Sequence, residues 1–97
     1  MHDMDVTLSD SVAIPEDVLY RELDDEAVLL NLKTGTYFGL NPAGVRIWQL
    51  IGEGSRLHSV LDAMKEEYEA EPEVLERDLL DLCRELCANG LCEVVRA

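Results

Sequence analysis

The most reactive side chains of this 97-residue chain are Cys83, Cys87, Cys92, His2 and His58. Cys83 and Cys87 are four residues apart, so on a helix both thiols would face the same side. A structural zinc site needs four ligands, and neither histidine lies near the cysteines in the sequence. No nucleophile with an adjacent base is indicated either. The chain is therefore predicted to bind no metal or other cofactor, and its cysteines to stay reduced and pack as small apolar side chains.

Carboxylates dominate the charge of the chain. It has 21 Asp and Glu against 8 Lys and Arg, a net charge of −13. Such a surface repels phosphate backbones and favours a basic or amphipathic partner, so no nucleic-acid partner is predicted. The chain lacks a run of about 20 apolar residues and the pattern of a signal peptide, so no membrane partner and a cytoplasmic location are expected. It also lacks a phosphate-binding glycine loop. The composition predicts no enzyme.

The most informative stretch runs over residues 33–51, KTGTYFGLNPAGVRIWQLI. Gly35 allows a tight turn because it adopts positive φ without steric cost. Residues 36–40 are rich in β-branched and aromatic side chains, which predicts a strand. Asn41 followed by Pro42 is typical of a helix N-cap and the first helical position. The stretch therefore predicts a turn, a short strand and a helix in that order.

The remaining elements must hold this stretch in place. Alternating and apolar runs predict two strands before it, and helical periodicity predicts two helices after it. Gly44 would let another element approach closely, and Trp48 is expected to pack in the core. The pattern predicts an α+β fold, a winged helix-turn-helix-like arrangement of a three-stranded antiparallel sheet followed by three helices. The expected strands are 18–23, 27–32 and 36–40, with a last short strand within 91–95. The expected helices are 42–51, 58–69 and 72–88. A single domain is predicted at 12–97, preceded by a flexible N-terminus at 1–11.

The third strand would lie at an edge of the sheet, where unpaired backbone groups must be covered or used. A helix, the N-terminal arm or a second copy of the chain could cover it. Alternatively, a partner peptide could add to the sheet as a further strand. A winged-helix fold also suggests DNA binding, but the third helix carries five acidic residues and only two arginines. The residues alone leave strand addition and a covered edge open.

The sequence also resembles a known family. The runs LLNLKTGTYFGLNPAGVRIWQLI and EPEVLERDLLDLCRELCANGLCEVV are similar to PqqD-like proteins, the leader-peptide recognition domains (RiPP recognition elements) of ribosomal natural-product pathways. The resemblance covers residues 14–95. Its stand-alone length and Tyr-Phe-Gly-Leu-Asn run look most like the leader-binding protein of lasso-peptide biosynthesis. The alternative within the family is the PqqD-type peptide chaperone of pyrroloquinoline quinone synthesis. The most specific motifs are Gly35-x-Tyr37-Phe38-x-Leu40-Asn41 and the Ile47-Trp48 pair.

The resemblance implies a function and a site. In such proteins the precursor's leader peptide adds as an antiparallel strand to the third strand, in a groove shared with the third helix, and the domain itself is not an enzyme. It holds the precursor while a cysteine peptidase cleaves it, and an ATP-dependent cyclase acts after the peptidase. The free protein is expected to be a monomer or a strand-exchanged dimer. The implied peptide-binding residues are Thr36, Tyr37, Phe38, Gly39 and Leu40 on the strand, and Asp78, Leu79, Leu82, Cys83 and Leu86 on the helix.

Two other classes of function remain open at this point. One is a winged-helix regulatory or protein-interaction domain that binds no leader. The other is an enzyme subunit whose cysteines take part in redox or metal chemistry.

Acidic residues at the rim of the groove, such as Asp78 and Asp81, would favour a leader with Lys or Arg and would raise the association rate more than the affinity.

Overall fold

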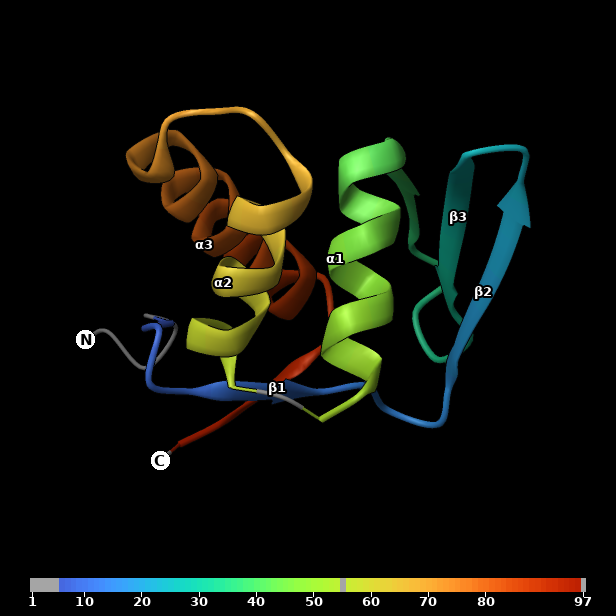
Figure 1. Cartoon of the computed structure of the whole chain (residues 1–97). Helices are drawn as coiled ribbons and strands as arrows, with labels where there is room; N and C mark the ends of the chain where they lie inside the picture. Colours follow the sequence, from blue (N-terminus) through green and yellow to red (C-terminus); the bar gives the residue numbers. More distant parts are fainter. Residues whose placement is uncertain (1–5, 55, 97) are drawn as a thin grey trace.

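The computed structural model describes residues 6–54 and 56–96 (Figure 1). Four strands are followed by three helices and a last strand. In chain order these are β1 (Ser11–Ala13), β2 (Val18–Leu23), β3 (Glu26–Asn31), β4 (Tyr37–Leu40), α1 (Pro42–Gly52), α2 (Leu57–Glu67), α3 (Pro72–Ala88) and β5 (Glu93–Val95).

The main sheet is the antiparallel meander that the sequence predicted. Its strand order is β2-β3-β4, so β3 is central and β4 lies at an edge. The register pairs Leu29 of β3 with Tyr20 of β2 on one side and with Phe38 of β4 on the other. The α+β prediction of a three-stranded sheet and three helices is therefore confirmed. The structure adds a second sheet, in which β1 pairs antiparallel with β5.

One face of the main sheet is covered by α1. Figure 1 shows this helix between the sheet and the pair formed by α2 and α3. Leu29 on the covered face and Ile51 on α1 are both buried. Trp48 packs in the core as predicted, and its ring stacks on Tyr20 with the ring centroids 6.1 Å apart. The core thus fixes α1, and with it the end of β4, against the sheet.

The helix boundaries follow from local chemistry. The Gly44 N–H donates to the Asn41 side chain over 2.8 Å, and Pro42 is the first residue of α1, as the sequence predicted. Pro72 likewise opens α3, and Gly90 ends it in the left-handed region at φ +72°. No helix in the two described ranges is long and apolar enough to cross a membrane.

Part of the segment 1–11, predicted to be a flexible N-terminus, lies against the start of α2. Its residues 1–5 lie outside the described residues, but Val6 and Asp10 are buried. The carbonyls of Leu8 and Asp10 accept the N–H groups of His58 and Leu57, each over 2.9 Å. The first N–H groups of a helix have no partner within the helix. The carbonyls of residues 8 and 10 therefore supply hydrogen-bond acceptors for the N-terminus of α2.

Candidate functional site

The edge strand β4 carries unpaired backbone groups. Antiparallel pairing turns alternate residues toward the neighbouring strand. The Asn31 N–H donates to the Thr36 carbonyl over 2.9 Å, which places Thr36, Phe38 and Leu40 among the residues that bond to β3. Tyr37 and Gly39 therefore direct their N–H and C=O groups away from β3. Among the described strands β4 pairs with β3 alone, so these groups form an open edge.

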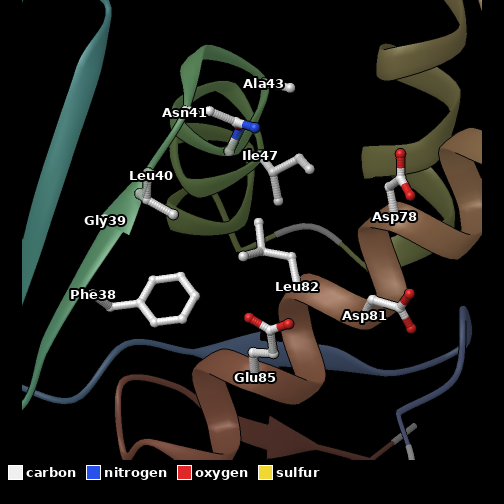
Figure 2. A pocket seen from close by; sticks show the side chains of 11 residues that line it. Phe38, Gly39, Leu40, Asn41, Ala43, Ile47, Asp78, Asp81, Leu82 and Glu85 are labelled. Carbon is white, nitrogen blue, oxygen red and sulfur yellow. The ribbon is translucent and has the colours of Figure 1, made fainter.

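A groove of about 390 Å³ lies beside this open edge, between β4, the start of α1 and α3 (Figure 2). Phe38 and Leu82 point toward one another across it, and Ile47 points into it from α1. The groove therefore combines an apolar interior with a strand edge able to form hydrogen bonds. Its lining residues are Phe38, Gly39, Leu40, Asn41, Ala43, Gly44, Ile47, Asp78, Asp81, Leu82 and Glu85.

Gly44 sets the distance between α1 and β4. A Cβ atom at this position would lie 3.2 Å from Cδ2 of Leu40, tighter than an ordinary van der Waals contact. The absence of a side chain therefore brings the first turn of α1 close against the end of β4. Both residues line the groove, and the contact agrees with the close approach that the sequence predicted at this glycine.

The rim of the groove on α3 is acidic. Asp78, Asp81 and Glu85 lie on one side of the helix because they are spaced by three and four residues. Arg77 is 3.6 Å from Asp78 and Arg84 is 3.0 Å from Asp81, but both pairs are exposed and so contribute little. In the described part of the chain no Lys or Arg pairs with Glu85, and none lines the groove. The groove is thus apolar inside and anionic at its rim.

The ten residues implied by the resemblance fall into three groups. Phe38, Gly39, Leu40, Asp78 and Leu82 line the groove. Two others contribute differently: Thr36 precedes β4 and bonds to β3, and the Tyr37 side chain is 72% exposed on the other face of the sheet, with only its backbone at the edge. The remaining three have no exposed surface and belong to the core instead of the groove lining: Leu79, Cys83 and Leu86.

The geometry of α3 explains this division. Residues 79, 83 and 86 form one helical stripe that faces the core, whereas 78, 81, 82 and 85 form the adjoining stripe that faces the groove. The resemblance did not place Glu85, Asn41, Ala43, Gly44 or Ile47 in the site. The spacing of Glu85 from Asp78 and Asp81 is the sequence signal that could have found it. The residues of α1 enter because this helix starts directly after β4.

The cysteines show no sign of a reactive site. Burial raises the pKa of the Cys83 thiol to about 12, and burial also raises the pKa of Cys92 and Cys87. A raised pKa keeps a thiol protonated and weakly nucleophilic at neutral pH. Within the described residues, no three His, Cys, Asp or Glu side chains are grouped to hold a metal ion.

Alkylation of the cysteines is therefore expected to be slow in the native protein. With iodoacetamide at pH 8, Cys83 and Cys92 should react at least about 100-fold more slowly than in urea-unfolded protein, because buried thiols form little thiolate. Half-buried Cys87 should react first. Mass spectrometry of peptides after timed quenching measures all three rates. Fast labelling of Cys83 in folded protein would contradict the burial described above.

Comparisons with known proteins place these features in a family context. The family model described as Coenzyme PQQ synthesis protein D (PqqD) matches residues 26–91. The solved structure of TbiB1 in complex with the TbiA(beta) leader peptide is similar at 46% identity and a TM-score of 0.78, over 84% of this chain and 94% of that chain. A lasso peptide synthetase B1 complexed with the leader peptide is similar at 28% identity and a TM-score of 0.76, over 84% and 96%. No curated protein sequence matches.

Proposed function

The chain belongs to the PqqD family, and we propose that it binds the leader segment of a ribosomally made precursor peptide by strand addition to β4. The observation that carries this proposal is the open edge at Tyr37 and Gly39 beside a groove with an apolar interior. Both similar solved structures hold a leader peptide. An edge strand bordered by a groove is suited to an extended peptide in particular.

The two halves of the site have different roles in this proposal. The N–H and C=O groups of Tyr37 and Gly39 bond to the backbone of the leader, which gives affinity that depends little on sequence. Alternate leader side chains then point into the groove between Phe38 and Leu82, because side chains of a strand alternate between its faces. Specificity therefore comes from apolar leader side chains spaced two residues apart.

The acidic rim adds a preference for charge. Asp78, Asp81 and Glu85 face a leader in the groove with carboxylates and no lining cation. Lys or Arg in the leader would be attracted to this rim and to the net charge of −13. Exposed charges of this kind steer association more than they stabilise the complex, so added salt should mainly lower the association rate.

The resemblance to lasso-peptide proteins extends the proposal to a pathway. The domain is non-catalytic and cytoplasmic, and it holds the precursor for a cysteine peptidase before an ATP-dependent cyclase acts. Support comes from the identity of 46% with TbiB1 and from the similarity to a lasso peptide synthetase B1.

Titration with a labelled leader tests the proposal. The probe is a fluorescein-labelled synthetic leader of the precursor encoded beside this chain, followed by fluorescence anisotropy. Leu82→Ala should weaken binding by roughly 10-fold, equivalent to about 1.4 kcal/mol, because it removes apolar contact from the groove.

Leu80→Ala is the matched control. Leu80 is also a half-buried leucine of α3, but it lies outside the groove lining, beside Glu76 and Arg77. Its replacement should leave the leader affinity within about twofold of the wild type, a difference of under 0.5 kcal/mol. A wild-type protein that shows no binding to this leader at 50-fold excess would refute the proposed function.

A further inference from the structure

Asn41 lies where the open edge of β4 meets the first turn of α1. Its backbone is extended, at φ −80° and ψ 176°, so the alternation of β4 continues through it. Its N–H therefore points away from β3, as the N–H groups of Tyr37 and Gly39 do. Its carbonyl, in contrast, accepts the Val45 N–H over 2.9 Å. At Asn41 the edge thus offers a backbone donor, while the acceptor is already engaged in α1.

The side-chain amide of Asn41 has a fixed orientation. The Gly44 N–H donates to its Oδ1 over 2.8 Å. Because an amide accepts only through its oxygen and donates only through its nitrogen, this bond leaves the two hydrogens of Nδ2 directed away from Gly44. Within the described residues, neither Nδ2 nor the backbone N–H of Asn41 has a hydrogen-bond partner. The helix cap therefore holds a second, side-chain donor in place beside the backbone donor.

Both donors are within reach of a peptide in the groove. Asn41 is exposed and lines the groove. Figure 2 shows its side chain at the end of the groove where α1 begins, beside Ala43. Ala43 and Gly44 follow it in the lining and carry little or no side chain. Asn41 thus remains accessible from the groove.

The groove offers a peptide many acceptors and few donors. Its rim carries the carboxylates of Asp78, Asp81 and Glu85, which only accept hydrogen bonds when ionised. Of the described residues that line the groove, Asn41 alone has a side-chain donor. A peptide carbonyl that loses water on binding must find another donor, because leaving it unpaired is costly. Asn41 is suited to supply that donor beyond the reach of Gly39.

An antiparallel leader runs opposite to β4, so the leader residues that face Asn41 belong to the N-terminal part of the paired stretch. We propose that Asn41 binds the leader there, with its N–H and Nδ2 donating to main-chain carbonyl oxygens of the leader. The inference rests on the proposed function. Because the Asn41 carbonyl is engaged by Val45, no leader N–H completes this pair, and regular pairing ends at Asn41. Asn41 thereby fixes the register of the leader, and with it which leader side chains enter the groove.

Two substitutions separate this role from helix capping. Asn41→Asp keeps an oxygen for the Gly44 N–H but replaces Nδ2 by a second acceptor. Asn41→Ser also keeps a capping oxygen and adds no charge. Asn, Asp and Ser are about equally good at the N-cap position, so α1 should be retained in both variants. Gln49→Glu is the matched control, because it makes the same amide-to-carboxylate change at an exposed position of α1 outside the groove lining.

The expected result is a loss of leader affinity without a loss of stability. In the anisotropy titration, Asn41→Asp should bind the labelled leader at least about 10-fold more weakly and Asn41→Ser about fivefold more weakly, whereas Gln49→Glu should stay within about twofold. The midpoint of urea unfolding should stay at the wild-type value in all three. Attraction between an acidic rim and a basic leader would give Asn41→Asp the opposite sign, a tighter complex.

NMR of isotope-labelled protein reads the same contact directly. The Nδ2 resonances of Asn41 are identified by their absence from the spectrum of Asn41→Ser. They should shift when unlabelled synthetic leader is added to the wild type, because a new acceptor changes the environment of the amide hydrogens.

Several results would overturn the inference while leaving strand addition intact. These are leader binding by folded Asn41→Asp that equals or exceeds that of the wild type, an equal loss of affinity in Gln49→Glu, or Nδ2 resonances that do not move. If Asn41→Asp proves less stable than the wild type, wild-type affinity in Asn41→Ser would overturn the inference in the same way. Failure of the wild type to bind the leader would overturn the proposed function and this inference together.

Discussion

Gly39→Pro is expected to lower the affinity for the leader by roughly 100-fold or more, equivalent to about 2.7 kcal/mol. Gly39 directs its N–H toward the open edge of β4, where the leader backbone would accept it. Proline removes this donor, and its ring occupies the space that the incoming strand needs. The fold should survive, because proline is tolerated on the solvent side of an edge strand and Phe38 before it is already extended.

Gly39→Ala is the control for this substitution. A Cβ atom at Gly39 would meet no other atom within 4 Å, and the residue does not adopt positive φ, so alanine fits without strain. Alanine keeps the N–H, so the leader affinity should stay within about threefold of the wild type, under 0.7 kcal/mol. If folded Gly39→Pro binds the leader as the wild type does, the leader does not add to β4 and the proposed mode of binding is wrong.

The elements around β4 could be predicted because their signals are local. Gly35 adopts φ +77° in the turn, Asn41 caps α1 and Pro42 opens it, each as its own chemistry dictates. The predicted strands and helices agree with the structure to within one or two residues at each end. Pairing, in contrast, is not local. The β1–β5 sheet joins three-residue strands from the two ends of the chain. Neither strand has an alternating pattern that would indicate that the two strands pair.

The site was harder to predict than the fold for a geometric reason. All residues of α3 near the groove are apolar or acidic, so residue type does not separate the groove stripe from the core stripe. A rotation of about 100° per residue puts Leu82 in the groove and Leu79 and Cys83 in the core. Which stripe of α3 faces the core depends on how the helix packs against α2 and the rest of the core. On β4, alternation likewise leaves Tyr37 and Gly39, and not all of residues 36–40, with free backbone groups.

Asn31 connects the two walls of the groove, and no feature of the sequence pointed to it. It is one of two buried polar residues of the described chain, on the covered face of the central strand β3. Its Nδ2 donates to the carbonyls of Gly90 and Asn89 at the end of α3, over 3.0 and 3.4 Å. Its Oδ1 accepts the N–H groups of Lys33 and Thr34 in the turn before β4, over 2.9 and 3.3 Å. One amide thus ties the turn before β4 to the end of α3.

Replacing Asn31 by leucine is therefore expected to lower the free energy of unfolding by about 3 kcal/mol, because leucine has a similar size but leaves these buried partners without a hydrogen bond. Urea unfolding followed by the fluorescence of Trp48, the only tryptophan, measures the change. Thr34→Ala is the control in the same turn: its hydroxyl bonds only exposed groups, so its loss should cost under about 1 kcal/mol.

Leader affinity should also fall in Asn31→Leu, even in urea-free buffer where the protein is folded, because the end of α3 is no longer held against the turn that leads into β4. An Asn31→Leu protein as stable as Thr34→Ala would show that this network does not position the groove.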